Sequence, residues 1–175
     1  MAINLVKCNI SFIECIFSLS YCPFLIKQFQ ISLNKNPLNN SETISLPTEI
    51  KNLVSDIENL LGGNKDLLPI DFLDLKPLTD FQKKILFTLR EKVPRGCVAT
   101  YGDIAKFANN PNAVRAVGNV MSNNPFPLFF PCHRVVASGT LPGGFNAGLE
   151  LKKRLLQTEL SHTELIKYFR RKIDE

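Results

Sequence analysis

The sequence has little of what marks a secreted or membrane-spanning protein. Its five cysteines are odd in number and form no Cys-x-x-Cys pair, which argues against a secreted disulfide framework. No apolar run is long enough to cross a bilayer. Lys7 and Glu14 interrupt the apolar N-terminus and no small-residue cleavage site follows, so we interpret this stretch as strands rather than as a signal peptide. These absences predict a cytoplasmic protein, or a nuclear one in a eukaryote.

Histidine is also scarce, since the chain has only two. Cys8, Cys15 and Cys22 recur every seven residues, which raises the possibility of a zinc site. Structural zinc is almost always four-coordinate, and three thiols without a nearby histidine do not supply four ligands. We therefore favour strand positions for these cysteines and predict no metal site.

The positive charge is concentrated in one half of the chain. Residues 1–93 hold ten Lys/Arg and ten Asp/Glu, whereas residues 94–175 hold eleven and six, so the net charge of +5 comes from the second half. A basic half beside a neutral half suggests a polyanionic partner for the basic half. An ordinary solvated face is the alternative.

The first half has the pattern of a small α/β unit. Residues 2–33 alternate imperfectly between apolar and polar, which predicts two or three antiparallel strands. A polar loop at 34–46 precedes apolar residues at helical spacing from 50 to 61, and Gly62-Gly63 ends that helix. A further strand is expected near residues 70–72. Because Lys76-Pro77 breaks the chain, we predict a scaffold domain at 1–76 and a second domain at 79–175.

The second half begins with helix signals. Thr79 and Gln82 fit a capping box at the start of a helix. Thr100 can cap a short helix, and residues 113–121 form a second helix after a short turn. Two short helices joined in this way are typical of a helix-turn-helix, although two packed core helices would give the same pattern.

The most unusual stretch is Phe129-Phe130-Pro131-Cys132-His133-Arg134-Val135-Val136. We expect buried extended chain on both sides of a break at Pro131. A thiol beside an imidazole is the raw material of a nucleophile, because the thiolate attacks and a base can generate it. A small buried cysteine beside a core histidine is the alternative.

A glycine-rich loop at 138–148 follows, and such loops let a backbone approach a ligand. Residues 149–160 predict a helix with Leu151, Leu155 and Leu156 inside and residues 152–154 (Lys-Lys-Arg) outside. A capping box at 161–164 predicts a terminal helix, with His162 exposed near its cap.

Together these motifs resemble the O6-alkylguanine-DNA alkyltransferases, also called methylated-DNA–protein-cysteine methyltransferases. The matching residues are Thr100-Tyr101-Gly102, Arg115-Ala116-Val117-Gly118, Asn124-Pro125, Pro131-Cys132-His133-Arg134-Val135 and Leu155-Leu156 with Glu159. They cover roughly residues 79–160, and the first 75 residues carry no family motif. The resemblance implies an α/β fold with a small antiparallel sheet in an RNase H-like N-terminal domain. It implies a mainly α, winged-helix-like C-terminal domain that contains the helix-turn-helix.

The resemblance also implies direct-reversal DNA repair. The O6-alkyl group of a flipped guanine would move to Cys132, leaving an irreversibly alkylated, single-turnover protein. The implied partner is double-stranded DNA, bound through the minor groove by a monomer, and no cofactor is required.

The roles implied by the resemblance fall into three groups. The catalytic residues would be Cys132, His133, Glu159 and Tyr101, the last as a proton donor to the leaving base, with a phosphate contact or packing as its alternatives. DNA would be bound by Arg115, Thr100, Tyr101, Ala116 and Gly118. The base pocket would contain Asn124, Val135, Phe145, Asn146 and Ala147. The methyl group of Ala147 stands where many family members have glycine, so we expect the pocket to restrict bulky adducts such as benzyl while admitting methyl.

Three other functions remain open. A lesion-binding alkyltransferase-like protein would lack the reactive cysteine, yet Cys132 is present. A helix-turn-helix regulator would carry base-reading Arg, Asn or Gln on its second helix, where Ala, Val and Gly predominate. A Cys-His hydrolase would turn over activated esters without DNA.

Overall fold

The computed structural model describes residues 4–10, 15–22, 25–33, 47–139 and 141–161. The predicted polar loop at 34–46 and the predicted terminal helix after Ser161, with His162, lie outside the described residues. In chain order the elements are β1 (Asn4–Ile10), β2 (Cys15–Cys22), β3 (Leu25–Leu33), α1 (Thr48–Leu61), α2 (Asp80–Lys92), β4 (Ala99–Thr100), α3 (Tyr101–Phe107), α4 (Val114–Ser122), a 3-10 helix (Cys132–Arg134), β5 (Val135–Val136) and α5 (Leu149–Gln157). The chain therefore has an α/β fold.

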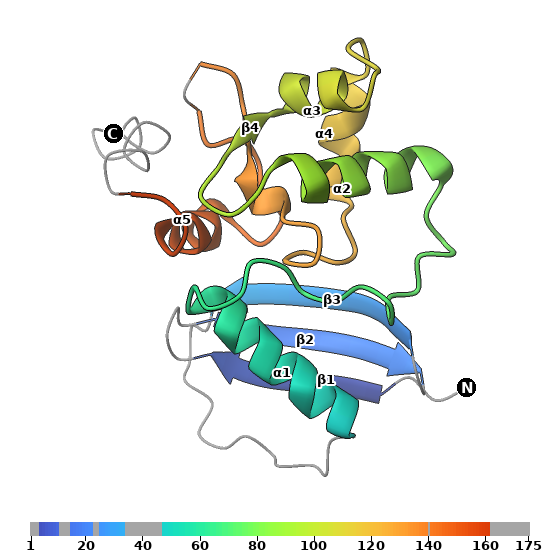
Figure 1. Ribbon diagram of the computed structural model, residues 1–175, viewed down its shortest axis with the longest axis vertical. Helices are drawn as coiled ribbons and strands as arrows, with labels where there is room; N and C mark the ends of the chain where they lie inside the picture. Colours follow the sequence, from blue (N-terminus) through green and yellow to red (C-terminus); the bar gives the residue numbers. More distant parts are fainter. Residues whose placement is uncertain (1–3, 11–14, 23–24, 34–46, 140, 162–175) are drawn as a thin grey trace.

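The N-terminal strands form an antiparallel sheet in the order β1-β2-β3, with α1 packed against it (Figure 1). This confirms the strands predicted for residues 2–33. Cys8, Cys15 and Cys22 occupy strand positions, as expected. One face of α1 is apolar at helical spacing, and its buried residues are Ile50, Leu53, Ile57, Leu60 and Leu61.

The strand predicted near residues 70–72 is wrong. Residues 71 and 72 form a turn, and only Leu73 makes an isolated parallel bridge, to Ile26 of β3. Pro69 cannot donate a ladder hydrogen bond, and the turn that follows leaves room for one bridge only. The backbone pairing is Ile26 N–H to Phe72 O at 2.7 Å and Asp74 N–H to Ile26 O at 2.9 Å.

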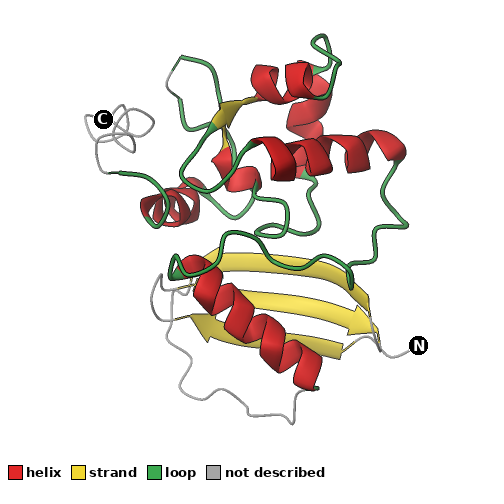
Figure 2. Cartoon of the chain, viewed as in Figure 1, coloured by secondary structure: helices red, strands yellow, loops and turns green. Residues whose placement is uncertain are grey.

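α2, α3 and α4 gather at the end of the molecule away from the sheet, and α5 lies closer to the sheet (Figure 2). Two of the three expected caps lie within the described residues, and both are present: Thr79 and Gln82 form a capping box on α2, and Thr100 and Asp103 form one on α3. The predicted second helix is α4. The parallel pair β4–β5 was not predicted, because two-residue strands leave no periodic pattern in the sequence.

The segment around Pro131 differs from the expected extended chain on its N-terminal side. Phe129 and Phe130 lie in a turn, whereas Val135 and Val136 form β5; all four are buried. Asn124 Oδ1 accepts the backbone N–H of Phe126 at 3.0 Å, and Phe130 N–H bonds Phe126 O at 3.0 Å, so local hydrogen bonds replace a sheet ladder here.

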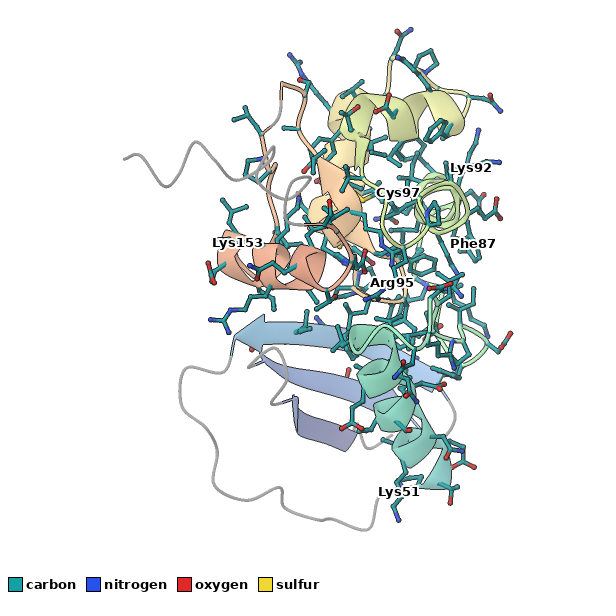
Figure 3. All side chains as sticks on the ribbon, turned by 60° about the vertical axis from the view of Figure 1, so that its left-hand side comes forward. Lys51, Phe87, Lys92, Arg95, Cys97 and Lys153 are labelled. Atoms are coloured by element: carbon teal, nitrogen blue, oxygen red, sulfur yellow. The ribbon has the colours of Figure 1, made fainter. Side chains whose placement is uncertain are left out.

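The two ends of the molecule share one continuous core, which runs from Ile26 on β3 to Leu155 on α5. Two arginines cross the junction. Arg90 donates to Phe129 O at 2.8 Å and to Leu68 O at 2.7 Å. Arg95 lies between the end of α1 and the residues after α5 (Figure 3), donating to Leu60 O at 2.7 Å and to Thr158 O at 2.5 Å. Within the described ranges, no helix is long and apolar enough to cross a membrane.

Candidate active site

Cys132 opens the short 3-10 helix between Pro131 and β5. Its backbone N–H bonds Phe130 O at 2.7 Å, and Arg134 N–H bonds Pro131 O at 2.9 Å, so the turn is fixed on both sides. The residue is 6% exposed. The thiol is therefore mostly shielded, with a small accessible area facing a pocket.

Asn124 holds the sulfur. Its Nδ2 lies 3.2 Å from Cys132 Sγ and 2.9 Å from Phe130 O, while its Oδ1 accepts from Phe126 N–H. Because the oxygen is committed to a backbone donor, the amide presents N–H to the sulfur. Burial raises the pKa of the Cys132 thiol, and the hydrogen bond from Asn124 and the nearby charge of Lys152 offset part of that rise. The resting sulfur is therefore a thiol, and Asn124 and Lys152 are the groups that stabilise the thiolate once a base takes the proton.

His133 pairs with Glu159 behind the cysteine. His133 Nε2 lies 3.1 Å from Glu159 Oε1, and both side chains are almost fully buried. Arg134 donates two hydrogen bonds to the same carboxylate, from Nε to Oε2 at 2.8 Å and from Nη2 to Oε1 at 3.0 Å. Its Nη1 donates to Val93 O at 3.0 Å. The glutamate thus has a bidentate arginine and an imidazole as partners.

These contacts determine the protonation of the pair. Burial acts to raise the pKa of Glu159, but hydrogen bonds from His133 and Arg134 outweigh it and hold the pKa at about 2. Burial lowers the pKa of His133, although Glu159 acts in the opposite direction. An ionised Glu159 can only accept, so a neutral His133 donates through Nε2 and leaves Nδ1 as a base. His133 Nδ1 is buried and has no hydrogen-bond partner among the described residues.

Lys152 corrects an expectation from the sequence. The predicted outward-facing residue is fully buried, and its Nζ donates to Val135 O at 2.5 Å and to Gly144 O at 3.3 Å. Burial lowers its pKa to about 8. The helical period contained the signal, because Lys152 is three residues before Leu155 and four before Leu156, on the same helix face.

A pocket of about 490 Å³ opens onto Cys132. It contains four of the five residues predicted for the base pocket, and the fifth, Val135, is buried outside its lining. The lining residues of this Cys132 pocket are Gln28, Phe29, Gln30, Ile31, Ser32, Met121, Ser122, Asn123, Asn124, Pro125, Pro127, Cys132, Phe145, Asn146 and Ala147. The Asn146 side chain donates to Ser122 O and so ties the glycine-rich loop to the end of α4. No pattern in the sequence predicted that β3 would contribute to this pocket.

Tyr101 and Thr100 lie at the start of α3. Tyr101 is half-buried and hydrogen-bonds to the backbone of Gly144, and burial raises its pKa. Its hydroxyl oxygen would lie 3.1 Å from a Cβ placed on Gly143, whose φ is +69°, so only glycine fits there. The Thr100 hydroxyl is occupied by its cap, donating to Asp103 Oδ2 at 2.7 Å and accepting from Asp103 N–H at 3.1 Å.

The predicted DNA-contacting residues of α4 share an open surface. Arg115 and Ala116 are exposed, and a Cβ placed on Gly118 would meet nothing within 4 Å. The opposite face is buried through Val117, Val120 and Met121. The N-terminal part of α4 is thus free to meet a ligand, while Met121 and Ser122 at its other end reach the Cys132 pocket.

Known proteins resemble this chain in sequence. Residues 80–161 match the model of the 6-O-methylguanine DNA methyltransferase DNA-binding domain. A methylated-DNA–protein-cysteine methyltransferase of Thermococcus barophilus is 37% identical over 146 residues, which are 82% of this chain and 80% of that protein. The protein of the same name from Haemophilus influenzae is 46% identical over 88 residues, 50% of this chain and 49% of that one.

Solved structures extend the likeness to nearly the whole chain. The O6-methylguanine-DNA methyltransferase of the archaeon Pyrococcus kodakaraensis matches with a TM-score of 0.67 and 26% identity, over 90% of this chain and 98% of that one. Mycobacterium tuberculosis OGT in complex with DNA shares the fold, with a TM-score of 0.69 and 24% identity over 94% of each chain.

Fold and site define a protein in which a buried cysteine, hydrogen-bonded by an asparagine amide, lies beside a His-Glu pair and a short two-helix unit. The chain belongs to the methylated-DNA–protein-cysteine methyltransferase family.

Proposed function

We propose that this chain repairs O6-alkylated guanine in DNA by direct reversal. Cys132 Sγ attacks the alkyl carbon, so an S–C bond forms while the C–O6 bond breaks and its electron pair remains on guanine. The thiol proton leaves through His133, and the departing guanine takes up a proton in its place. A thioether has no easy reverse reaction, so each chain acts once and needs no cofactor.

His133 is the base in this scheme, and Glu159 is its positioning partner. Glu159 fixes the opposite nitrogen as the donor, so the lone pair of Nδ1, which meets no hydrogen-bond donor among the described residues, can accept a proton. A bridging water between Cys132 Sγ and Nδ1 is the proposed route of the proton, as in the family. The His133–Glu159 geometry supports this assignment of roles.

Tyr101 is the proposed proton donor to the leaving base. Burial raises its pKa, so the phenol stays protonated at neutral pH and can donate a hydrogen bond. Guanine would leave with negative charge on O6 unless a donor met it, so this proton transfer favours the forward reaction.

The DNA-binding surface is proposed on α3 and α4. O6 lies inside the base stack and cannot reach a buried sulfur, so the nucleotide must be flipped out. Arg115 would fill the gap, while Ala116 and Gly118 allow α4 to approach the minor groove of double-stranded DNA closely. Thr100 would contact DNA at the start of α3 beside Tyr101, and a monomer suffices for this mode.

The Cys132 pocket is the proposed site for the flipped base. Asn124, Phe145, Asn146 and Ala147 line it, and Val135 supports it from behind. The methyl group of Ala147 takes up space in the Cys132 pocket, so an O6-methyl group should be accommodated more readily than an O6-benzyl group.

The finer description of the fold belongs to the same proposal. It divides the chain into an RNase H-like scaffold at 1–76 and a winged-helix-like domain at 79–175, and places the protein in the cytoplasm, or in the nucleus of a eukaryote. The connection of α3 to α4 supports the helix-turn-helix within the second domain.

One observation carries this function: the sulfur of Cys132 faces a pocket of nucleobase-accommodating size while Asn124 Nδ2 lies 3.2 Å away. A buried cysteine with only a packing role would face apolar atoms.

The test is the intact mass of the protein after incubation with duplex DNA containing O6-methylguanine. Wild type should gain one methyl group per chain, mapped to Cys132, and Cys132→Ala should gain none. Cys97→Ala is the matched control, because Cys97 is an exposed free cysteine outside the site, and it should react as wild type does. Selective binding of the lesion without any mass gain would contradict transfer and favour a lesion-marking protein.

A further inference from the structure

The far wall of the Cys132 pocket is built by the N-terminal sheet. Five consecutive residues of β3, from Gln28 to Ser32, line the pocket together with Cys132 and Asn124. β3 is an edge strand of its sheet and pairs with β2, and its other side forms one isolated bridge among the described residues, from Ile26 to Leu73. It is the strand of the sheet that lies nearest the helices of the second half of the chain (Figure 1). The scaffold half of the chain therefore takes part in the pocket of the catalytic half.

The β3 wall presents a row of polar groups. Alternate residues of a strand point to opposite sides, so Gln28, Gln30 and Ser32 share one side, while Phe29 and Ile31 share the other. The three polar residues are exposed, and the two apolar ones are buried. Within the described part of the chain, the side-chain amides of Gln28 and Gln30 have no hydrogen-bond partner, so they are available to a ligand.

This wall is fixed in place against the reactive loop. Phe29 N–H donates to Pro125 O at 2.9 Å, the residue directly after Asn124. The rings of Phe29 and Phe129 meet edge to face with centroids 5.3 Å apart. The segment that holds Cys132 Sγ is therefore in direct contact with the strand that carries the glutamines.

Resting on the proposed function, we propose that the β3 wall selects the O6-substituent, with Gln28, Gln30 and Ser32 favouring substituents that end in a hydrogen-bonding group. A base attached to DNA on α4 enters past Met121 and Ser122, which line the pocket at the end of that helix. The substituent carbon that is bonded to O6 must reach Cys132 Sγ. Any substituent longer than methyl therefore extends into the rest of the Cys132 pocket, toward β3. The side-chain amides of Gln28 and Gln30 can hydrogen-bond to a hydroxyl group on the substituent, which would otherwise lose its hydrogen bonds to water.

The matched pair of substrates is O6-(2-hydroxyethyl)guanine and O6-propylguanine, each in the same duplex. The two substituents have the same number of heavy atoms and differ in one hydroxyl against one methyl. The step is the same for both: the S–C bond forms at the carbon attached to O6, and the C–O6 bond breaks. One satisfied hydrogen bond should make wild type transfer hydroxyethyl about tenfold faster than propyl.

The measurement is the second-order rate constant for each transfer, followed by intact mass. In the double variant Gln28→Leu/Gln30→Leu, the hydroxyethyl-to-propyl ratio should fall to about one or below. Gln157→Leu is the matched control, because Gln157 is an exposed glutamine at the end of α5, and it should keep the wild-type ratio. Methyl transfer in each variant reports whether the pocket is assembled.

A second variant changes charge rather than polarity. Gln30→Glu keeps the side-chain size and places a carboxylate in the wall, so it should slow transfer from O6-carboxymethylguanine by about tenfold relative to methyl. Two outcomes would overturn the role of the β3 wall without touching the proposed transfer reaction. One is a hydroxyethyl-to-propyl ratio of about one in the wild type. The other is a double variant that transfers methyl normally and keeps the wild-type ratio. Absence of methyl transfer from the wild type would overturn the proposed function itself.

Discussion

The sheet end and the helical end of the molecule bury different chemistry. Around the sheet, α1 buries five residues, all apolar. Around Cys132, three polar side chains are no more than 1% exposed: His133, Arg134 and Lys152. Buried polar groups cost stability unless every one is paired, so their concentration in one region marks where chemistry outweighs packing. The sheet end contributes apolar packing and, through β3, one wall of the pocket.

The largest expected effect comes from opening the buried ion pair at the helical end. Arg134→Ala leaves Glu159 without its bidentate partner and should lower the free energy of unfolding by about 3–5 kcal/mol. Urea denaturation measures the loss. The comparison at the sheet end is Lys65→Ala, which removes a partly exposed pair with Asp56 at 2.6 Å and should cost less than about 1 kcal/mol. Equal losses in the two variants would contradict the difference in burial.

The next effect separates stability from chemistry. Ile57 on α1 is fully buried, so Ile57→Ala should cost about 2–5 kcal/mol through lost burial and a cavity. Its methyl-transfer rate constant should stay within about threefold of wild type wherever the variant is folded, since Ile57 lies outside the Cys132 pocket. Urea denaturation and transfer kinetics on one preparation check both. A large loss of rate in fully folded protein would mean that the scaffold couples to the chemistry beyond β3.

Acid should act mainly at the helical end. The pKa of Glu159 is about 2 in the folded protein against an ordinary 4.5, so its stabilising contribution is complete above about pH 4.5 and is lost as pH falls toward 2. A shift of this size corresponds to about 3 kcal/mol. The difference in unfolding free energy between wild type and Glu159→Gln should therefore narrow over this range. A difference that stays constant with pH would show that the charge of Glu159 is not what the fold requires.

The smallest effect compares two matched caps. Thr79 caps α2 and Thr100 caps α3 with the same capping-box geometry, so each Thr→Ala change should cost about 1 kcal/mol of stability. Only Thr100→Ala should also slow transfer, because it loosens the start of the helix that carries Tyr101. Thermal unfolding and methyl-transfer rates of the two variants test this prediction. If both variants slow transfer equally, the cap at Thr100 has no specific role in the reaction.

Local patterns in the sequence predicted much of the fold. The alternation in residues 2–33, the stripe at 50–61 and the capping threonines each depend on near neighbours, and each prediction was confirmed. The strand expected near 70–72 was wrong, because Pro69 and the following turn reduced it to a single bridge at Leu73. The apolar pattern was correct there, since Leu73 is buried, but burial alone does not require a strand.

The candidate site was predictable where its residues are adjacent or belong to a family motif. Cys132 and His133 are neighbours in sequence, and Glu159 came from the resemblance; the structure brings His133 and Glu159 within 3.1 Å. Lys152 was misplaced although the helical period carried the signal, because a lysine is rarely fully buried. Its burial depends on two carbonyl oxygens, of Val135 and Gly144, that come from other segments.

From the sequence by itself we predicted Cys132 as the nucleophile with His133 as its base, the starts of α2 and α3, and the strands β1 to β3, because short-range pattern and chemistry suffice for each prediction. Only the tertiary structure decided which polar groups are buried, that Asn124 holds the sulfur, and that Gln28 and Gln30 of β3 face the pocket of a cysteine about a hundred residues away. The physical reason is that burial and pocket walls arise from contacts between distant segments, and no local period in the chain records them.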